Sequence, residues 1–221
     1  MNLKTLLGAA TLACGLAVTL PASATLTLQT GLVGGSGDVD NVIFNACGLG
    51  SSSGTTVQGC LNTSDTTRVN FTSNETLTIG GGGQAVIAAM DGFFSTVTIA
   101  LANASTGFGK LQFNLDAVAD GSVSFSAVDQ FGTVFSFSGF SLDGSGQNFF
   151  TLGSLDGQVA MSLTITSTVA LQNLVNLEQV RIGSASTTPV AVPEPASLAL
   201  FGAGLLGLGL VRRRKSQLVQ A

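Results

Sequence analysis

Apolar and hydroxyl-bearing residues alternate along the middle of the chain. Val123, Phe125 and Ala127 alternate with serines at 122, 124 and 126. The same period of two occurs at 26–28, 97–101, 111–115, 135–138 and 161–166. A period of two is typical of strands that bury one face and expose the other. The pattern therefore predicts strands with an apolar inner face and a Ser/Thr-rich outer face.

Asp-Gly pairs separate several of these segments. They occur at 91–92, 120–121, 143–144 and 156–157. This dipeptide supplies the positive φ angles that tight hairpins need. Together with the alternation, it predicts an all-β fold: an antiparallel β-sandwich, jelly-roll-like, with eight to ten strands. Residues 170–180 are expected to form a short helix or an edge segment before a last strand at 180–182.

The first 24 residues have the organisation of a secretory signal peptide. Lys4 precedes an apolar run from Leu6 to Leu20, and Ala22 and Ala24 form a small-x-small cleavage site. These features predict export by the Sec machinery, with cleavage by signal peptidase after Ala24. A lipoprotein signal at Cys14 is the alternative, but that cut would leave the apolar residues 16–20 on the mature chain.

The end of the chain has three parts in a fixed order. Pro193, Glu194 and Pro195 are followed by the uncharged segment 197–211 and then by a basic cluster. That cluster consists of Arg212, Arg213, Arg214 and Lys215. As a helix, the apolar segment would rise ~22 Å, which is short for a bilayer core of ~30 Å, although snorkelling cations reduce the mismatch. We expect a single transmembrane helix with the basic cluster on the cytoplasmic side.

Residues 190–221 resemble the PEP-CTERM sorting signal of Gram-negative bacteria, because the Pro-Glu-Pro motif, the short apolar helix and the basic cluster occur in that order. The resemblance implies processing by an exosortase, a membrane-embedded cysteine transpeptidase-like enzyme that reads the motif at Pro193, Glu194 and Pro195. It also implies an association with exopolysaccharide or biofilm. The six residues after Lys215 make a slightly longer tail than the pattern has.

These features divide the chain into five parts. They are a signal peptide at 1–24, a β-sandwich domain at 25–183, a linker at 184–191, the sorting signal at 192–215 and a cytoplasmic tail at 216–221. The core at 25–188 holds three cations against eleven acidic residues, a formal charge of −8. That charge excludes nucleic acid as a partner.

Two cysteines remain after removal of the signal peptide, Cys47 and Cys60. An even number in an exported protein predicts a disulfide, and the Gly/Ser/Thr-rich segment between them is flexible enough to close. The alternative is a metal or redox pair, which the absence of histidine disfavours.

Candidate chemistry is sparse. Without histidine the chain has no Ser-His-Asp or Cys-His set, and no cofactor is expected. Asp38, Asp40 and Asn41 follow a glycine-rich segment and form a weak calcium candidate; the EF-hand spacing is missing, so no metal is assigned. Trp and Tyr, which usually stack on sugars, are absent.

Three functions follow as hypotheses. The first is a non-enzymatic surface or matrix protein with extracellular polysaccharide as a candidate partner. It would pass through an intermediate that the C-terminal helix anchors in the inner membrane before it reaches the cell surface. The second is a carbohydrate-binding module with a defined sugar site. The third is a secreted hydrolase with paired carboxylates.

Overall fold

The computed structural model describes residues 25–45, 47–48, 53–80, 83–155, 157–172 and 177–186, and the single position 204. The chain divides into two units, Met1–Ala185 and Ser186–Ala221. The predicted signal peptide, most of the predicted linker and, apart from position 204, the sorting signal lie outside the described residues. No helix in the described part is long and apolar enough to cross a membrane. The helix predicted at 197–211 lies outside that part except for position 204.

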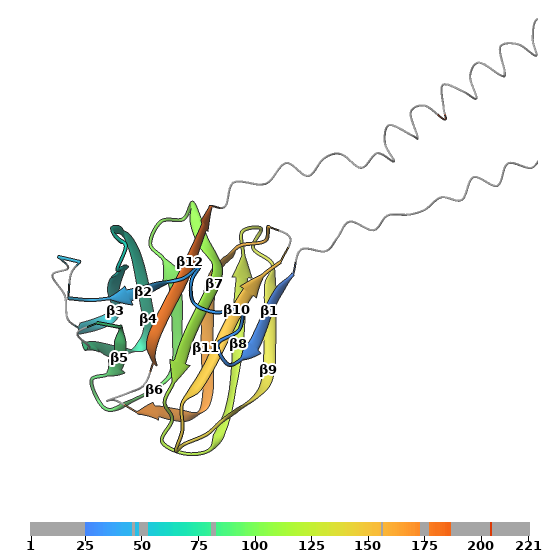
Figure 1. The fold of residues 1–221 in the computed structure, drawn as a ribbon. Coiled ribbons are helices and arrows are strands. Elements are labelled where there is room, and N and C mark those ends of the chain that lie inside the picture. Colours follow the sequence, from blue (N-terminus) through green and yellow to red (C-terminus); the bar gives the residue numbers. More distant parts are fainter. Residues whose placement is uncertain are drawn as a thin grey trace, which may run out of the picture. The chain divides into compact units, whose positions relative to one another are not determined.

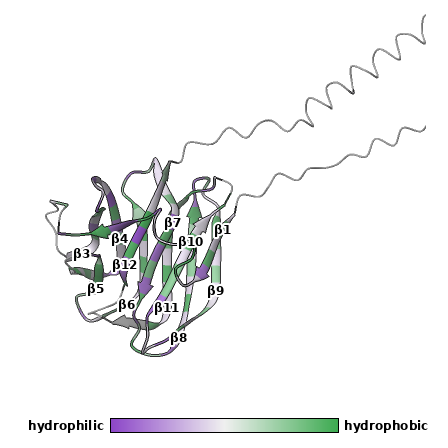
Figure 2. Ribbon diagram, in the orientation of Figure 1, coloured by the Kyte–Doolittle hydropathy of each residue, from purple (hydrophilic) through white to green (hydrophobic). Residues whose placement is uncertain are grey.

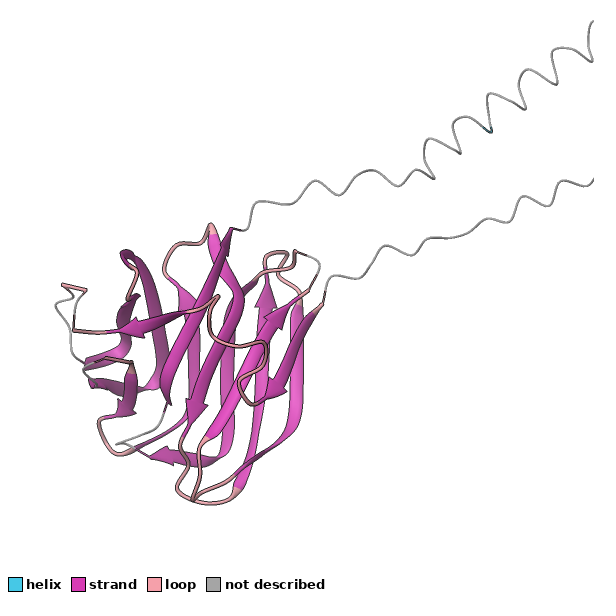
Figure 3. Ribbon diagram, in the orientation of Figure 1, coloured by secondary structure: helices cyan, strands magenta, loops and turns pink. Residues whose placement is uncertain are grey.

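The first unit is all-β, as Figure 3 shows. Its strands in chain order are β1 (Leu26–Thr30), β2 (Asp40–Ile43), β3 (Ser53–Leu61), β4 (Ser64–Gly80), β5 (Val86–Ala89), β6 (Phe93–Leu101), β7 (Thr106–Leu115), β8 (Gly121–Asp129), β9 (Val134–Leu142), β10 (Asn148–Ser154), β11 (Ala160–Gln172) and β12 (Leu177–Ser186). Every pairing with a described register is antiparallel. The predicted all-β antiparallel class is therefore confirmed.

The strands join in one hydrogen-bonded sheet, in the order β1-β10-β7-β12-β2-β3-β4-β6-β11-β8-β9. Figure 1 shows β1, β10, β7 and β12 side by side, with β6, β11, β8 and β9 behind them. The two layers meet where Phe108 of β7 pairs with Ala160 of β11. The sheet thus closes on itself, whereas a sandwich keeps two separate sheets. The predicted sandwich is corrected to this closed sheet with further strands at its ends.

Gly107 makes that closure possible. A Cβ at this position would lie 2.3 Å from the carbonyl oxygen of Ala160 and 2.6 Å from a methyl group of Val159. Only glycine lets the backbones of β7 and β11 approach this closely. The closure therefore depends on a residue that the alternation pattern does not single out.

Phenylalanine rings fill the space between the layers. Phe125 of β8 lies 4.9 Å from Phe150 of β10 and 5.9 Å from Phe113 of β7, measured between ring centroids. Phe140 of β9 meets the same cluster at 5.5 Å from Phe125. Tilted and edge-on contacts at these distances stabilise aromatic pairs beyond simple burial. Figure 2 shows the alternation of hydrophobic and hydrophilic residues along the strands that directs these rings inward.

Two boundaries differ from those expected. β11 runs to Gln172, so the start of the segment 170–180 is strand. β12 begins at Leu177 and continues to Ser186, past the predicted domain boundary at residue 183. The first residues of the expected linker therefore belong to a strand, where β12 pairs with its neighbours in the sheet.

Candidate functional site

A groove of about 560 Å³ lies on the outer face of β1, β10, β7 and β12. These four strands supply its floor, and the loop between β1 and β2 forms one wall. Its lining residues are Thr27, Gln29, Val33, Gly34, Asp38, Gly109, Lys110, Thr151, Gly153, Ser154, Leu155, Gly183 and Ser184. Most of them are glycines or residues with hydroxyl or amide groups. The groove is therefore a concave surface with few bulky side chains, in which polar groups lie among exposed carbon.

Lys110 of β7 fixes the loop wall. Its Nζ donates to the carbonyl oxygens of Gly34 at 3.1 Å and Gly35 at 2.8 Å. It also donates to Asp38 Oδ1 at 2.9 Å. A lysine ammonium has three N–H donors, so all three are used within the chain. Lys110 holds the wall and has no donor left for a ligand.

A second side chain of β7 and one of β10 hold the same loop. Gln112 Nε2 donates to the carbonyl oxygens of Val33 at 3.2 Å and Gly35 at 3.0 Å. Thr151 Oγ1 donates to the Gly31 carbonyl at 2.7 Å and accepts from the Val33 amide at 3.0 Å. The loop bonds to β7 and β10 through polar side chains, which sets the wall in place before any ligand arrives.

Gly153 leaves open space in the floor of the groove. In the register it pairs with Thr27 of β1 and with Lys110 of β7. A Cβ there would meet only Thr27 Oγ1, at 3.5 Å. That distance is an ordinary van der Waals contact, so packing does not require glycine. Gly183 differs, because a Cβ there would lie 2.8 Å from the Asp38 carbonyl oxygen.

The groove lining includes polar side chains without hydrogen bonds and exposed apolar side chains. Within the described part of the chain, neither Gln29 nor Ser184 makes a side-chain hydrogen bond. Val33 and Leu155 expose 41% and 51% of their surface. The groove thus offers free amide and hydroxyl groups beside exposed aliphatic carbon.

The pKa of Asp38, in the groove wall, is lowered. The hydrogen bond from Lys110 lowers the pKa of its carboxyl, because the charged form is the better acceptor. The charges of Lys110 and Asp38 cancel, so the pair adds no net charge to the groove.

Two of the three calcium candidates accept hydrogen bonds from side chains of the chain. Asp38 Oδ1 accepts from Lys110, while Asn41 Oδ1 accepts from Gln84 Nε2 at 3.3 Å and from Arg181 Nε at 3.2 Å. Asp40 lies in β2. Two of the three oxygens therefore already accept from donors of the chain. Over the described ranges, no three His, Cys, Asp or Glu residues gather as metal ligands would.

One pair of carboxylates interacts outside the groove. Burial raises the pKa of Asp116, and the negative charge of Glu178 raises it further. Glu178 Oε1 accepts from Asn114 Nδ2 at 2.6 Å. Asn114 is fully buried and its Oδ1 has no partner in the described structure. Sequence reasoning did not single out these residues.

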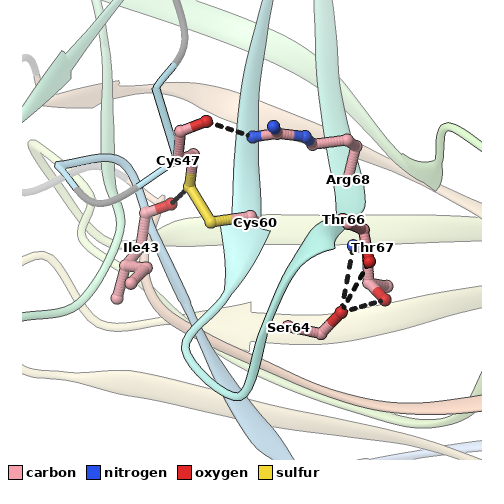
Figure 4. Close-up of a disulfide and its surroundings, with 7 residues drawn as sticks. All are labelled: Ile43, Cys47, Cys60, Ser64, Thr66, Thr67 and Arg68. Carbon is pink, nitrogen blue, oxygen red and sulfur yellow. Dashed lines mark hydrogen bonds between the residues drawn. A yellow bond between two sulfur atoms is a disulfide. The ribbon is translucent and has the colours of Figure 1, made fainter.

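The predicted disulfide is confirmed. Cys47 and Cys60 are bonded, with their Cα atoms 5.7 Å apart. Figure 4 shows Arg68 of β4 beside the bridge, where its Nη1 donates to the Cys47 carbonyl at 2.6 Å. The bridge ties the segment after β2 to the end of β3.

The predicted hydroxyl-bearing outer face is present on the second layer. Six hydroxyl residues on neighbouring strands pair across the sheet: Thr56, Thr72, Thr98, Thr164, Ser126 and Ser136. Thr56 and Thr72 are 3.0 Å apart between their Oγ1 atoms, and Thr98 and Thr164 are 2.9 Å apart. These hydroxyls largely bond to one another. The face is a solvated surface, so the groove is the better candidate site.

Comparison with known protein families identifies a motif in the C-terminal segment. The PEP-CTERM protein-sorting motif matches residues 191–215. The chain therefore carries this sorting motif, as the sequence resemblance predicted. The motif implies export, processing by an exosortase in the membrane, and sorting toward the cell surface. Apart from position 204, its residues lie outside the described structure.

No curated protein matches the chain. Among solved structures, a mutant of the family 29 carbohydrate-binding module CBM29-2 aligns with 77% of this chain and 99% of its own, at 12% identity and a TM-score of 0.28. A TM-score this low is below that of chains with the same fold, so no property passes from that module to this chain.

Proposed function

We propose that this chain is a non-enzymatic surface protein that an exosortase sorts and that associates with extracellular polysaccharide. The observation that carries the proposal is the sorting motif at residues 191–215. An apolar segment and a cluster of four cations, Arg212 to Lys215, accompany the motif. In this scheme the tail determines destination, and the β-domain remains outside the cell.

The composition of the β-domain supports a binding role over catalysis. The chain has no histidine, and its one lysine between residues 25 and 188 is fully engaged in the groove wall. The uncharged outer hydroxyl row and the groove, with its free amide and hydroxyl groups beside exposed carbon, both suit contact with a hydrated polymer. A hydrolase would instead release reducing ends from polysaccharide, and we expect no such release.

Cell fractionation tests the sorting step. Deletion of residues 193–221 is expected to move the protein from the envelope or surface fraction to the periplasm or the medium. Deletion of residues 216–221 alone is the matched control, because it keeps the motif, the apolar segment and the cations. Unchanged fractionation of the longer deletion would contradict the proposal.

A carbohydrate-binding module with a defined sugar site is the second candidate. The groove is the observation that favours it, because it combines free polar groups with exposed aliphatic surface. The two candidates are compatible, since a sorted matrix protein needs a surface that contacts the matrix.

A further inference from the structure

We propose that the groove on β1, β10, β7 and β12 binds neutral sugar residues of a polysaccharide, with Gly153 as its floor. The inference rests on the proposed function and names the site and the ligand class. Four properties of the groove support it: an unfilled floor, a balanced charge, free polar groups and a wall fixed in advance.

The floor is open although the packing would accept a side chain. A Cβ on Gly153 would make a single ordinary contact, with Thr27 Oγ1 at 3.5 Å. Glycine weakens a strand interior and often marks a place where a ligand approaches the backbone. Gly153 lies inside β10, between its paired neighbours on β1 and β7. A ligand that occupies the space above Gly153 would explain why the strand keeps a glycine that weakens it.

The charge balance of the groove favours a neutral ligand. Lys110 is 13% exposed and gives all three donors to the loop, one of them to Asp38. An anionic sugar would therefore find no free cation here. It would also approach a domain with a formal charge of −8, which repels acidic polymers.

The free groups match the surface of a sugar ring. A pyranose presents hydroxyls around its edge and C–H groups on its faces. Gln29 and Ser184 supply amide and hydroxyl groups for the edge, and Val33 and Leu155 supply aliphatic carbon for a face. Small-molecule sites combine apolar lining with a few placed polar groups in this way.

The wall needs no rearrangement to receive a ligand. Gln112 and Thr151 bond to the same loop as Lys110, at its Gly31, Val33 and Gly35 positions. A preorganised wall lowers the entropy lost on binding. The volume of about 560 Å³ is within the range of small-molecule sites.

Affinity electrophoresis of the full-length protein in detergent tests the proposal. The probes are neutral dextran, mannan and galactan, with anionic alginate as the charged comparison. We expect at least one neutral polymer to retard the protein and alginate to leave it unretarded. Gly153→Thr, which fills the floor, is expected to weaken the binding at least about tenfold, a change of ~1.4 kcal/mol.

The matched control is Gly80→Thr. Gly80 ends β4, and a Cβ there would meet no atom within 4 Å. It lies outside the groove lining, so this variant should bind like the wild type. Gln29→Ala is the second groove variant. It removes a free amide without placing bulk in the strand, so it tests the site even if Gly153→Thr unfolds.

Two results would overturn the inference. One is that no neutral polymer retards the protein, whether or not alginate does. The other is folded Gly153→Thr and Gln29→Ala proteins that bind as tightly as the wild type. A different measurement tests the proposed function. Unchanged cell fractionation of the variant that lacks residues 193–221 would contradict it. A protein that is sorted normally but loses no binding in the groove variants would refute only the sugar site.

Discussion

Lys110 Nζ lies 2.9 Å from Asp38 Oδ1 and joins β7 to a loop 72 residues earlier in the chain. The two partners differ in environment, because 13% of the lysine side chain and 64% of the aspartate side chain are exposed. This asymmetry leads to different expectations for the two residues.

Lys110→Met should destabilise the protein more than Asp38→Asn. The lysine change leaves two carbonyl oxygens and a carboxylate without their donor, which should cost about 1–3 kcal/mol. The aspartate change removes one exposed ion pair, worth less than about 1 kcal/mol. Urea unfolding of both variants gives the comparison. Equal losses would show that the backbone carbonyls contribute nothing to the wall.

The contribution of Asp38 should depend on pH. Its folded-state pKa is lowered by Lys110, so the carboxylate stabilises the fold fully above the ordinary aspartate value of about 3.9. That contribution is lost as the pH falls through the lowered pKa. The free energies of unfolding of the wild type and Asp38→Asn should therefore differ at pH 6 and converge at low pH. A gap that widens with acid would contradict this assignment.

Asp116→Asn should stabilise the protein at neutral pH. Burial and the charge of Glu178 raise the folded-state pKa of Asp116, so stability falls as the pH rises from about 3.9 through the raised value. Asparagine removes this penalty, with a gain below about 1 kcal/mol because the group stays partly solvated. Thermal unfolding at pH 7 and below pH 4 measures it. The gain should be present at pH 7 and absent in acid; a loss at pH 7 would show that the charge is needed.

Replacing Cys47 and Cys60 together by serine should lower the free energy of unfolding by about 3 kcal/mol, because the bridge closes a short loop in the unfolded chain. The sequence separation of the two cysteines is 13. Reduction of the wild-type protein is the parallel arm and should give a similar loss. Two titratable thiols in the unreduced exported protein would rule out the bridge.

Sequence reasoning located the strands well where one face is buried. The alternation at 122–127 and 161–166 lies within β8 and β11. The period of two is readable because successive side chains point to opposite faces.

The pairing of distant strands was beyond that reasoning. The closure of β7 on β11 depends on a backbone approach at Gly107, which no local pattern encodes. The groove was missed for the same reason, since its wall and floor come from segments far apart in sequence. One signal was present: Lys110 is the sole lysine of residues 25–188, and an isolated cation in an acidic domain indicates a specific partner.

The C-terminal mass of the surface-exposed protein tests the central claim most directly. An exosortase substrate should lose its apolar segment on processing, so intact-mass spectrometry should find a chain that ends between residues 190 and 215. Substituting the motif by Glu194→Gln tests whether that cleavage needs the carboxylate between Pro193 and Pro195. The account predicts a shortened wild-type chain at the surface. A surface form that still ends at Ala221 would contradict it.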